Sequence, residues 1–393
     1  MDSKSGFCER ILQFQTRLAE RRIDAAVLIH SRDILYYTSV GLPSILLVTP
    51  SDYHLYVRQG WSFASKELHI DQQHASEGSP KDAAEKLVNW TKNKGVIGFE
   101  TDVMTAETYF KWRKMLPDSE FTNLSPIILE QRSKKDGEEI DLVRKACKIA
   151  DIGHGRVIEA LKEGMSEFEL AAEIEYAERR AGDEGTFFMR APNLYLRGIV
   201  ASGPNLYKWS GVAYSITGMG PSPALPVGPS HRNIERGDVV IVDLGPCFNG
   251  YYADESRTYV VGKANPEVVS LFSRLKDICD QIISALREGV ECRQLYHQAT
   301  THAKGLNLSE YFLNLGGDRK SRLVGHGLGL EVNEPPFLAD HENSTLQEGC
   351  VLSIEAHVMH PKGVVKLEDV VLVTRHGAEM LTLSPRKLIE VGG

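Results

Sequence analysis

Residues 240–254 read Val240-Ile241-Val242-Asp243-Leu244-Gly245-Pro246-Cys247-Phe248-Asn249-Gly250-Tyr251-Tyr252-Ala253-Asp254. An apolar run ends at Asp243, and Asn249-Gly250 is the pair most typical of a tight β-hairpin turn. A hairpin centred there sets Asp243 opposite Ser256. Because side chains alternate between the two faces of a strand, Asp254 points to the same face as Asp243. Two carboxylates therefore share one side of a sheet.

A second pair of acids, Glu355 and Glu368, flanks Pro361-Lys362-Gly363. A hairpin centred between Pro361 and Lys362 places these two glutamates directly opposite each other. A cross-strand pair of like charges destabilises a sheet unless something neutralises it. We expect a bound divalent cation to do so.

Size and charge narrow the class of protein. A chain of 393 residues predicts two domains. With 45 Lys and Arg against 53 Asp and Glu, the net charge is −8 and no basic tract stands out, which argues against a nucleic-acid partner. The first residues lack a signal pattern and no apolar run could cross a bilayer, so we expect a cytoplasmic protein without membrane contact. Six cysteines without CxxC spacing fit reduced thiols.

The first third of the chain alternates helical and strand patterns, as α/β domains do. A helical pattern around Ile11–Leu18 precedes short apolar runs at Ala25–Ile29, Ile45–Thr49 and Val96–Phe99. The sequence becomes strongly charged near residues 132–139, where a long helical pattern begins. We therefore expect an α+β protein with domains at 1–133 and 134–393, the second rich in strands.

The segment 203–231 is rich in Gly and Pro and carries Tyr207, Trp209 and Tyr214. Long stretches without periodicity inside a compact domain are either disordered or functional. Because this segment leads into the strand of Asp243, we expect a loop that faces the substrate, with Tyr207 and Trp209 as substrate-binding residues. A plain surface loop and ordinary core packing of the aromatic residues are the alternatives.

Between the two hairpins, His326 stands in Gly325-His326-Gly327-Leu328-Gly329, where glycines let the backbone approach a ligand closely. A single histidine in such a loop is weak evidence. The ordered set is stronger, because it supplies four carboxylates and one imidazole: Asp243, Asp254, His326, Glu355 and Glu368. An oxygen-rich set with one nitrogen suits two hard or borderline divalent ions and excludes a thiolate-type zinc site.

This order and spacing resemble the pita-bread metallohydrolases, which include prolidase, Xaa-Pro aminopeptidase, methionine aminopeptidase and the non-peptidase creatinase. The matching segments of the C-terminal part are Ile234–Asp238, Asp254–Thr258, His326–Gly329, Leu352–Glu355 and Leu367–Thr374. The N-terminal part, including Ala25–Ile29 and Tyr36–Gly41, resembles the creatinase-type amino-terminal domain. The resemblance covers most of the chain and implies a creatinase-type α/β domain followed by a pita-bread catalytic domain.

The resemblance also implies roles for the five residues. Asp254 and Glu368 would bridge the two ions, Asp243 would bind one ion, and His326 and Glu355 would bind the other and form the catalytic group. The implied reaction is hydrolysis of a dipeptide or small amide by an activated water, with Glu355 moving its proton to the leaving amine. Manganese is the first expectation for the metal, with Co, Fe and Zn as alternatives. The resemblance implies a homodimer.

Two positions depart from the family pattern. Asn333 stands where prolidases and aminopeptidases carry a second histidine, and Val227 follows Ala224-Leu225-Pro226 where they carry another. Both histidines normally hydrogen-bond the substrate. Asn333 can donate from its amide, but it cannot carry a proton as imidazole does. The sequence therefore predicts a complete metal centre with altered substrate contacts.

Two other functions stay open. One is a metal-dependent enzyme of the same fold, a lyase or hydrolase that acts on a small sulfonium or ammonium compound held by the aromatic residues of 203–231 through cation–π contacts. The other is a catalytically silent binding protein, which the intact ligand set disfavours. Substrate screening separates the enzyme classes.

Overall fold

The structure is a computed structural model that describes residues 3–92, 94–185, 187–188, 190, 195–211 and 213–392. It divides into two compact units, Met1–Arg132 and Ser133–Gly393, and the expected boundary after residue 133 lies next to this division.

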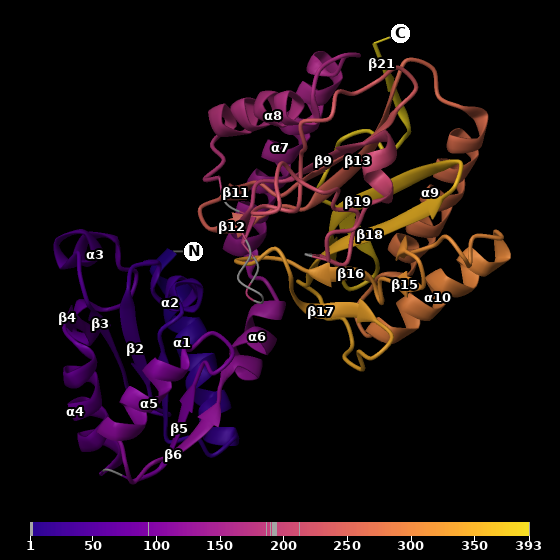
Figure 1. The fold of residues 1–393 in the computed structure, drawn as a ribbon. Coiled ribbons are helices and arrows are strands. Elements are labelled where there is room, and N and C mark those ends of the chain that lie inside the picture. The colour runs from indigo at the N-terminus through magenta and orange to yellow at the C-terminus, as the bar shows by residue number, and fades with distance from the viewer. Residues whose placement is uncertain are drawn as a thin grey trace. The chain divides into compact units, whose positions relative to one another are not determined.

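The first unit is a six-stranded sheet with helices around it, in agreement with the α/β pattern of the sequence (Figure 1). The strand order is β4-β3-β2-β1-β5-β6, with parallel pairs β1–β5, β5–β6 and β3–β4 and antiparallel pairs β1–β2 and β2–β3. The strands are β1 Ala25–Leu28, β2 Ser44–Val48, β3 Tyr53–Val57, β4 Ala75–Glu77, β5 Val96–Phe99 and β6 Glu120–Asn123. The helices are α1 Ser3–Glu20, α2 Ser31–Thr38, α3 Trp61–Glu67, α4 Pro80–Thr91, α5 Ala106–Met115 and α6 Ser125–Ser133, with a 3₁₀ turn at Gln72–His74.

The second unit contains the helices α7 Gly137–Ala160, α8 Glu167–Ala181, α9 Pro266–Ala285 and α10 Cys292–Gly305. Local capping sets two of their starts: Asp136 with Glu139 and Ser166 with Glu169 form capping boxes, which satisfy the first free N–H groups of α7 and α8. No helix in the described part of the chain is both long and apolar enough to span a bilayer.

The sheet of the second unit follows the order β17-β16-β18-β19-β13-β10-β9, with β20 on β19 and β21 on β13. Its strands are β9 Ile199–Ser202, β10 Val239–Leu244, β13 Glu255–Val261, β16 Leu323–Gly327, β17 Glu334–Ala339, β18 Val351–His360, β19 Gly363–Val373, β20 Ala378–Met380 and β21 Ile389–Val391. Three small hairpins pair β7 Phe187–Phe188 with β8 Tyr195–Leu196, β11 Cys247–Phe248 with β12 Tyr251–Tyr252, and β14 Asn314–Gly316 with β15 Arg319–Lys320. The expected α+β architecture is confirmed.

Alternation along the strands separates a helix-covered face from a second face, which we call the polar face because it carries the predicted ligands; apolar residues such as Ile241 are buried on it as well. Val240 and Val242 of β10 pack with α7 and α8, while Ile354 of β18 and Leu367 of β19 pack with α9 and α10. Residues of the other parity, such as Asp243, must then point to the opposite face. That face carries the predicted ligands.

Both predicted hairpin registers are confirmed. Asp243 pairs with Ser256 across β10 and β13, and Glu355 pairs directly with Glu368 across β18 and β19. Ser256 in turn pairs with Glu368, which joins the two hairpins into one sheet. Acids that are distant in the sequence therefore become neighbours on adjacent strands.

Candidate metal centre

The five predicted ligand residues lie together on the polar face of the second sheet. Asp243 belongs to β10, Asp254 directly precedes β13, His326 lies in β16, Glu355 in β18 and Glu368 in β19. Each is at least nine-tenths buried. Side chains from five separate segments of the chain thus converge in a site with little access to solvent.

His326 is the centre of one part of the site. Its Nε2 atom lies 3.6 Å from Asp254 Oδ2, 3.8 Å from Glu355 Oε1 and 3.9 Å from Glu368 Oε1. Ligand atoms of Asp254, His326 and Glu368 all lie within 4.8 Å of one another. The Ser353 hydroxyl donates to Glu368 Oε1 over 2.7 Å and orients that carboxylate.

Lys366 is the centre of the other part, and the sequence analysis missed it. Its Nζ atom lies 2.6 Å from Asp243 Oδ2, 2.8 Å from Glu368 Oε2 and 3.1 Å from Glu355 Oε2. Lys366 precedes Glu368 by two residues, so the alternation of β19 places both on one face. That spacing was the available signal, but a lysine in a strand is usually exposed.

Burial and mutual repulsion shape the pKa values in the site. Burial raises the pKa of Asp243 to about 7 against the opposing charge of Lys366. Burial, followed by the charges of Glu368 and Asp243, raises the pKa of Asp254 well above its usual value. Burial acts in the same direction on Glu355, but the charges of Lys366 and His326, together with hydrogen bonds from Lys366 and Ser215, outweigh it and lower the pKa of Glu355. The site therefore holds more acid than its one ammonium neutralises.

The donor set fits a divalent ion. Hard and borderline divalent ions prefer carboxylate oxygens with an imidazole nitrogen, which are the groups gathered here. Four carboxylates gathered around the ammonium of Lys366 leave the site short of positive charge. The residues that would hold metal are the five predicted ones, and their ligation stays a prediction.

The segment 203–231 does reach the site, through a residue that the sequence analysis did not name. The Ser215 hydroxyl donates to Glu355 Oε2 over 3.2 Å, and Ser215 is buried. After the 3₁₀ turn at Gly203–Tyr207 the described residues of this segment form neither a helix nor a strand. Without periodicity, no pattern could single out Ser215.

Tyr207 and Trp209, the residues of this segment predicted to bind substrate, contact residues outside the set of predicted ligands. The Tyr207 hydroxyl donates to the main-chain oxygen of His360 over 2.8 Å, and His360 is five residues, or about 17 Å, along β18 from Glu355. The Arg319 guanidinium lies 5.1 Å from the ring centroid of Trp209. Asn333 is half-buried directly before β17. Their role in substrate binding stays a prediction.

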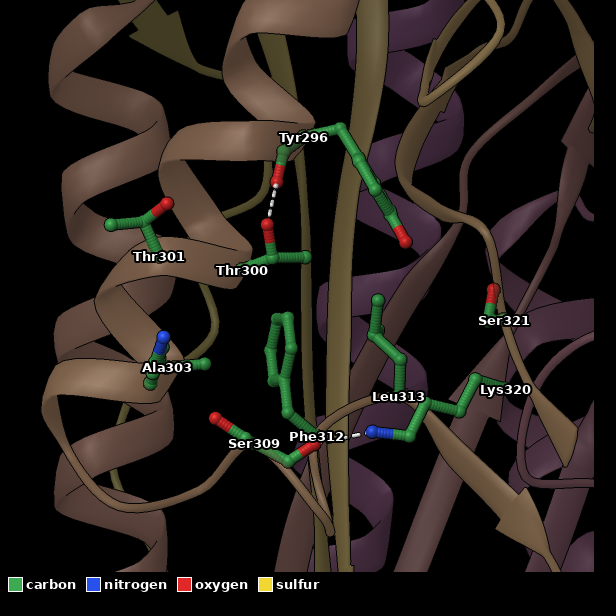
Figure 2. Close-up of a pocket in the computed structure, with 10 residues that line it drawn as sticks. Tyr296, Thr300, Thr301, Ala303, Ser309, Phe312, Leu313, Lys320 and Ser321 are labelled. Atoms are coloured by element: carbon green, nitrogen blue, oxygen red, sulfur yellow. Dashed lines mark hydrogen bonds between the residues drawn. The ribbon is translucent and has the colours of Figure 1, made fainter. Parts of the chain in front are cut away.

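The second unit also contains a cavity, and the first unit contains a second group of acidic residues. A cavity of about 380 Å³ lies between α10 and β14–β15, lined by residues such as Tyr296, Phe312 and Lys320 (Figure 2), and neither His326 nor any of the four predicted acidic ligands lines it. In the first unit, Asp33 and Glu100 lie near His30, but Asp33 pairs with Arg132 at 2.6 Å. This second group of acids already has an internal cation.

Known protein families match most of the chain. The model of the creatinase/prolidase N-terminal domain matches residues 10–134, and the model of metallopeptidase family M24 matches residues 141–375. An Xaa-Pro dipeptidase from Pyrococcus furiosus is 33% identical over 299 residues, 76% of either chain. One from Pyrococcus horikoshii is 29% identical and covers 99% of this chain and 100% of its own.

A solved structure agrees with these matches. The Xaa-Pro dipeptidase from Bacillus anthracis has a TM-score of 0.82 and 25% identity, and covers 98% of this chain and 100% of its own. The expected creatinase-type domain and pita-bread catalytic domain are thereby confirmed. Because the family model matches more than half of its residues, the chain belongs to metallopeptidase family M24 and is a metallohydrolase.

Proposed function

We propose that this protein hydrolyses dipeptides or other small amides at a centre of two divalent ions held by Asp243, Asp254, His326, Glu355 and Glu368. The observation that carries the proposal is the burial of four carboxylates and one imidazole on one sheet face, with the ammonium of Lys366 among them. The names of the relatives, Xaa-Pro dipeptidases, support a dipeptide substrate. Bound divalent ions would lower the pKa of a water molecule and polarise the scissile carbonyl.

The protein's own groups would handle the proton. Glu355 has a lowered pKa, so it is ionised and able to accept a proton from water and pass it to the leaving amine. The hydroxyl of Ser215 holds one oxygen of Glu355 in place. Asn333 offers an amide donor to the substrate carbonyl but no exchangeable imidazole proton.

Four finer statements belong to the same proposal. Manganese is the metal to test first, with cobalt, iron and zinc as alternatives, since all accept mixed oxygen and nitrogen ligands. The protein is cytoplasmic and acts as a homodimer on a small substrate. Gly-Pro and Ala-Pro are poor substrates, because Asn333 and Val227 replace imidazoles that would contact the substrate.

The aromatic side chains give no support to the sulfonium or ammonium alternative. The Arg319 guanidinium already lies over the Trp209 ring, so a ligand cation would compete with it there. A hydrolase acting on amides is therefore the function we propose.

A Mn²⁺-supplemented screen of dipeptides, small amides and sulfonium or ammonium compounds tests the proposal. We expect cleavage of at least one dipeptide or amide class, with slow or absent cleavage of Gly-Pro and Ala-Pro. Metal-loaded protein that cleaves no dipeptide or amide would contradict the function. Fast turnover of Gly-Pro would contradict only the argument from Asn333 and Val227 and would leave the proposed hydrolase function intact.

A further inference from the structure

The metal centre contains a cation of its own. The ammonium of Lys366 has three N–H donors, and three carboxylate oxygens surround it at 2.6, 2.8 and 3.1 Å. The side chain is 2% exposed, so water does not replace these contacts. Hydrogen bonds between Thr258 Oγ1 and both the N–H and the carbonyl of Lys366 fix the backbone from which the side chain extends.

The oxygens of the two paired glutamates divide the site into two halves. The Oε2 atoms of Glu355 and Glu368 face Lys366, and with Asp243 they form what we call the lysine half. The Oε1 atoms of the same residues face His326. With Asp254 and the imidazole they form the histidine half. In the histidine half no lysine or arginine of the described residues lies within ion-pair distance of the Oε1 atoms.

A metal ion and the ammonium compete for the same oxygens in the lysine half. A first-row divalent ion needs these oxygens at about 2.0–2.2 Å, which would bring it against the positively charged Nζ atom. Lys366 must therefore withdraw before an ion can bind in this half. The apparent affinity for this ion is the intrinsic affinity multiplied by the fraction of molecules in which Lys366 has withdrawn.

We propose that Lys366 is the resident cation of the lysine half, and that a divalent ion enters this half only by displacing it, after the histidine half has filled. The inference rests on the proposed function, because it assumes that the same ligands bind metal. It adds an order of filling and names the residue that sets it. In metal-free protein, Lys366 holds Asp243, Glu355 and Glu368 together.

Equilibrium dialysis of metal-stripped, full-length protein against increasing free Mn²⁺, with elemental analysis of bound Mn, tests the order. For the wild type we expect one ion per chain first, and the second at a free concentration at least about tenfold higher. Lys366→Met keeps the apolar stem and removes the charge, so the second ion should bind at least about tenfold more tightly. Lys366→Arg keeps the charge and should keep two-step filling.

Lys362→Met is the matched control, because Lys362 lies at the exposed turn of the same hairpin and pairs with Glu267. It should leave the Mn²⁺ curve unchanged. A second readout is the melting temperature of metal-free protein, which Lys366→Met should lower and Mn²⁺ should restore, since unpaired buried carboxylates repel one another.

Three results would overturn the proposal. Single-step filling of both halves in the wild type would do so, and this measurement needs no variant to fold. An unchanged second-ion affinity in Lys366→Met would do so as well. Both leave the proposed function intact if dipeptides are cleaved, whereas wild-type protein that binds no Mn²⁺ contradicts the function and the inference together.

Discussion

The two faces of strands β13 and β19 each bury an ion cluster, and the clusters differ in charge balance. On the helix-covered face, Arg257 Nη2 lies 2.6 Å from Glu255 and 2.7 Å from Asp369, and Arg386 Nε lies 2.7 Å from Asp369. Arg386 also pairs with Asp280, which Lys276 contacts in turn, so three basic groups meet three carboxylates. Such a cluster is complete without a ligand.

On the polar face, one ammonium meets three carboxylates, and Asp254 adds a fourth. One residue along the strand, from Asp369 to Glu368, therefore separates a balanced cluster from one that needs further positive charge. Burial of charge alone does not identify a ligand site. An uncompensated excess of one sign does, since leaving it unpaired would cost stability.

The largest effect should follow from breaking the balanced cluster. Arg257→Met leaves Asp369 and Glu255 short of a cation, so we expect the catalytic unit to lose about 3–5 kcal/mol of unfolding free energy. Urea unfolding measures this loss. Arg144→Met, which breaks an exposed pair with Glu379, should cost about 1 kcal/mol or less. Equal losses in the two variants would remove the distinction between the clusters.

Glu368→Gln should cost metal and activity but little stability, in contrast to Arg257→Met. Wild-type protein should contain close to two divalent ions per chain, and the variant should lose at least one of them. Its activity should fall by more than about 100-fold, because changes outside the direct ligands already cost up to that factor. Its metal-free unfolding free energy should stay within about 1 kcal/mol of the wild type.

Elemental analysis, substrate turnover and urea unfolding check these three values, with the exposed Glu379→Gln as the control. A Glu368→Gln protein that keeps both ions at unchanged affinity would remove Glu368 from the ligand set.

Ser215→Ala should have a smaller effect on the polar face. Losing the hydrogen bond to Glu355 frees one carboxylate oxygen, so we expect kcat to fall by about tenfold, the size of one such bond to a charged group. Bound metal should stay the same. Ser222→Ala, an exposed position of the same 203–231 segment, serves as the control. A normal kcat in Ser215→Ala would mean that Glu355 is held by its other contacts.

His154, on the helix-covered face, should give an effect that appears only as the pH falls. Burial, with the charge of Arg257, lowers the pKa of His154 from 6.5 to about 3. Below pH 6.5 the imidazole of His154 binds a proton in the unfolded chain but not in the folded protein. The contribution of His154 to the unfolding free energy is therefore fully present above pH 6.5 and is lost as the pH drops toward 3. The loss is about 1 kcal/mol per pH unit.

His154→Gln should therefore show a shallower loss of unfolding free energy between pH 6.5 and 4.5 than the wild type, measured by urea unfolding at each pH. His297→Gln, at an exposed position, should follow the wild-type slope. Parallel slopes for His154→Gln and wild type would contradict the low pKa.

The sequence predicted most of the site because its evidence is local. Asn249-Gly250 and Pro361-Lys362 mark turns, turns set hairpin registers, and registers place Asp243 and Glu355 on known faces. Lys366 and Ser215 escaped prediction for different reasons. A strand lysine looks exposed until its neighbours are known, and the segment of Ser215 has no repeating pattern.

The residue types and turn positions of the chain are enough to specify two acid-bearing hairpins and the class of ion they suit. What they leave open is how the hairpins meet, because no local rule pairs β13 with β19 across more than one hundred residues. That long-range pairing brings Ser256 opposite Glu368 and aims Lys366 at three carboxylates. The charge balance of the metal centre is thus a property of the assembled sheet.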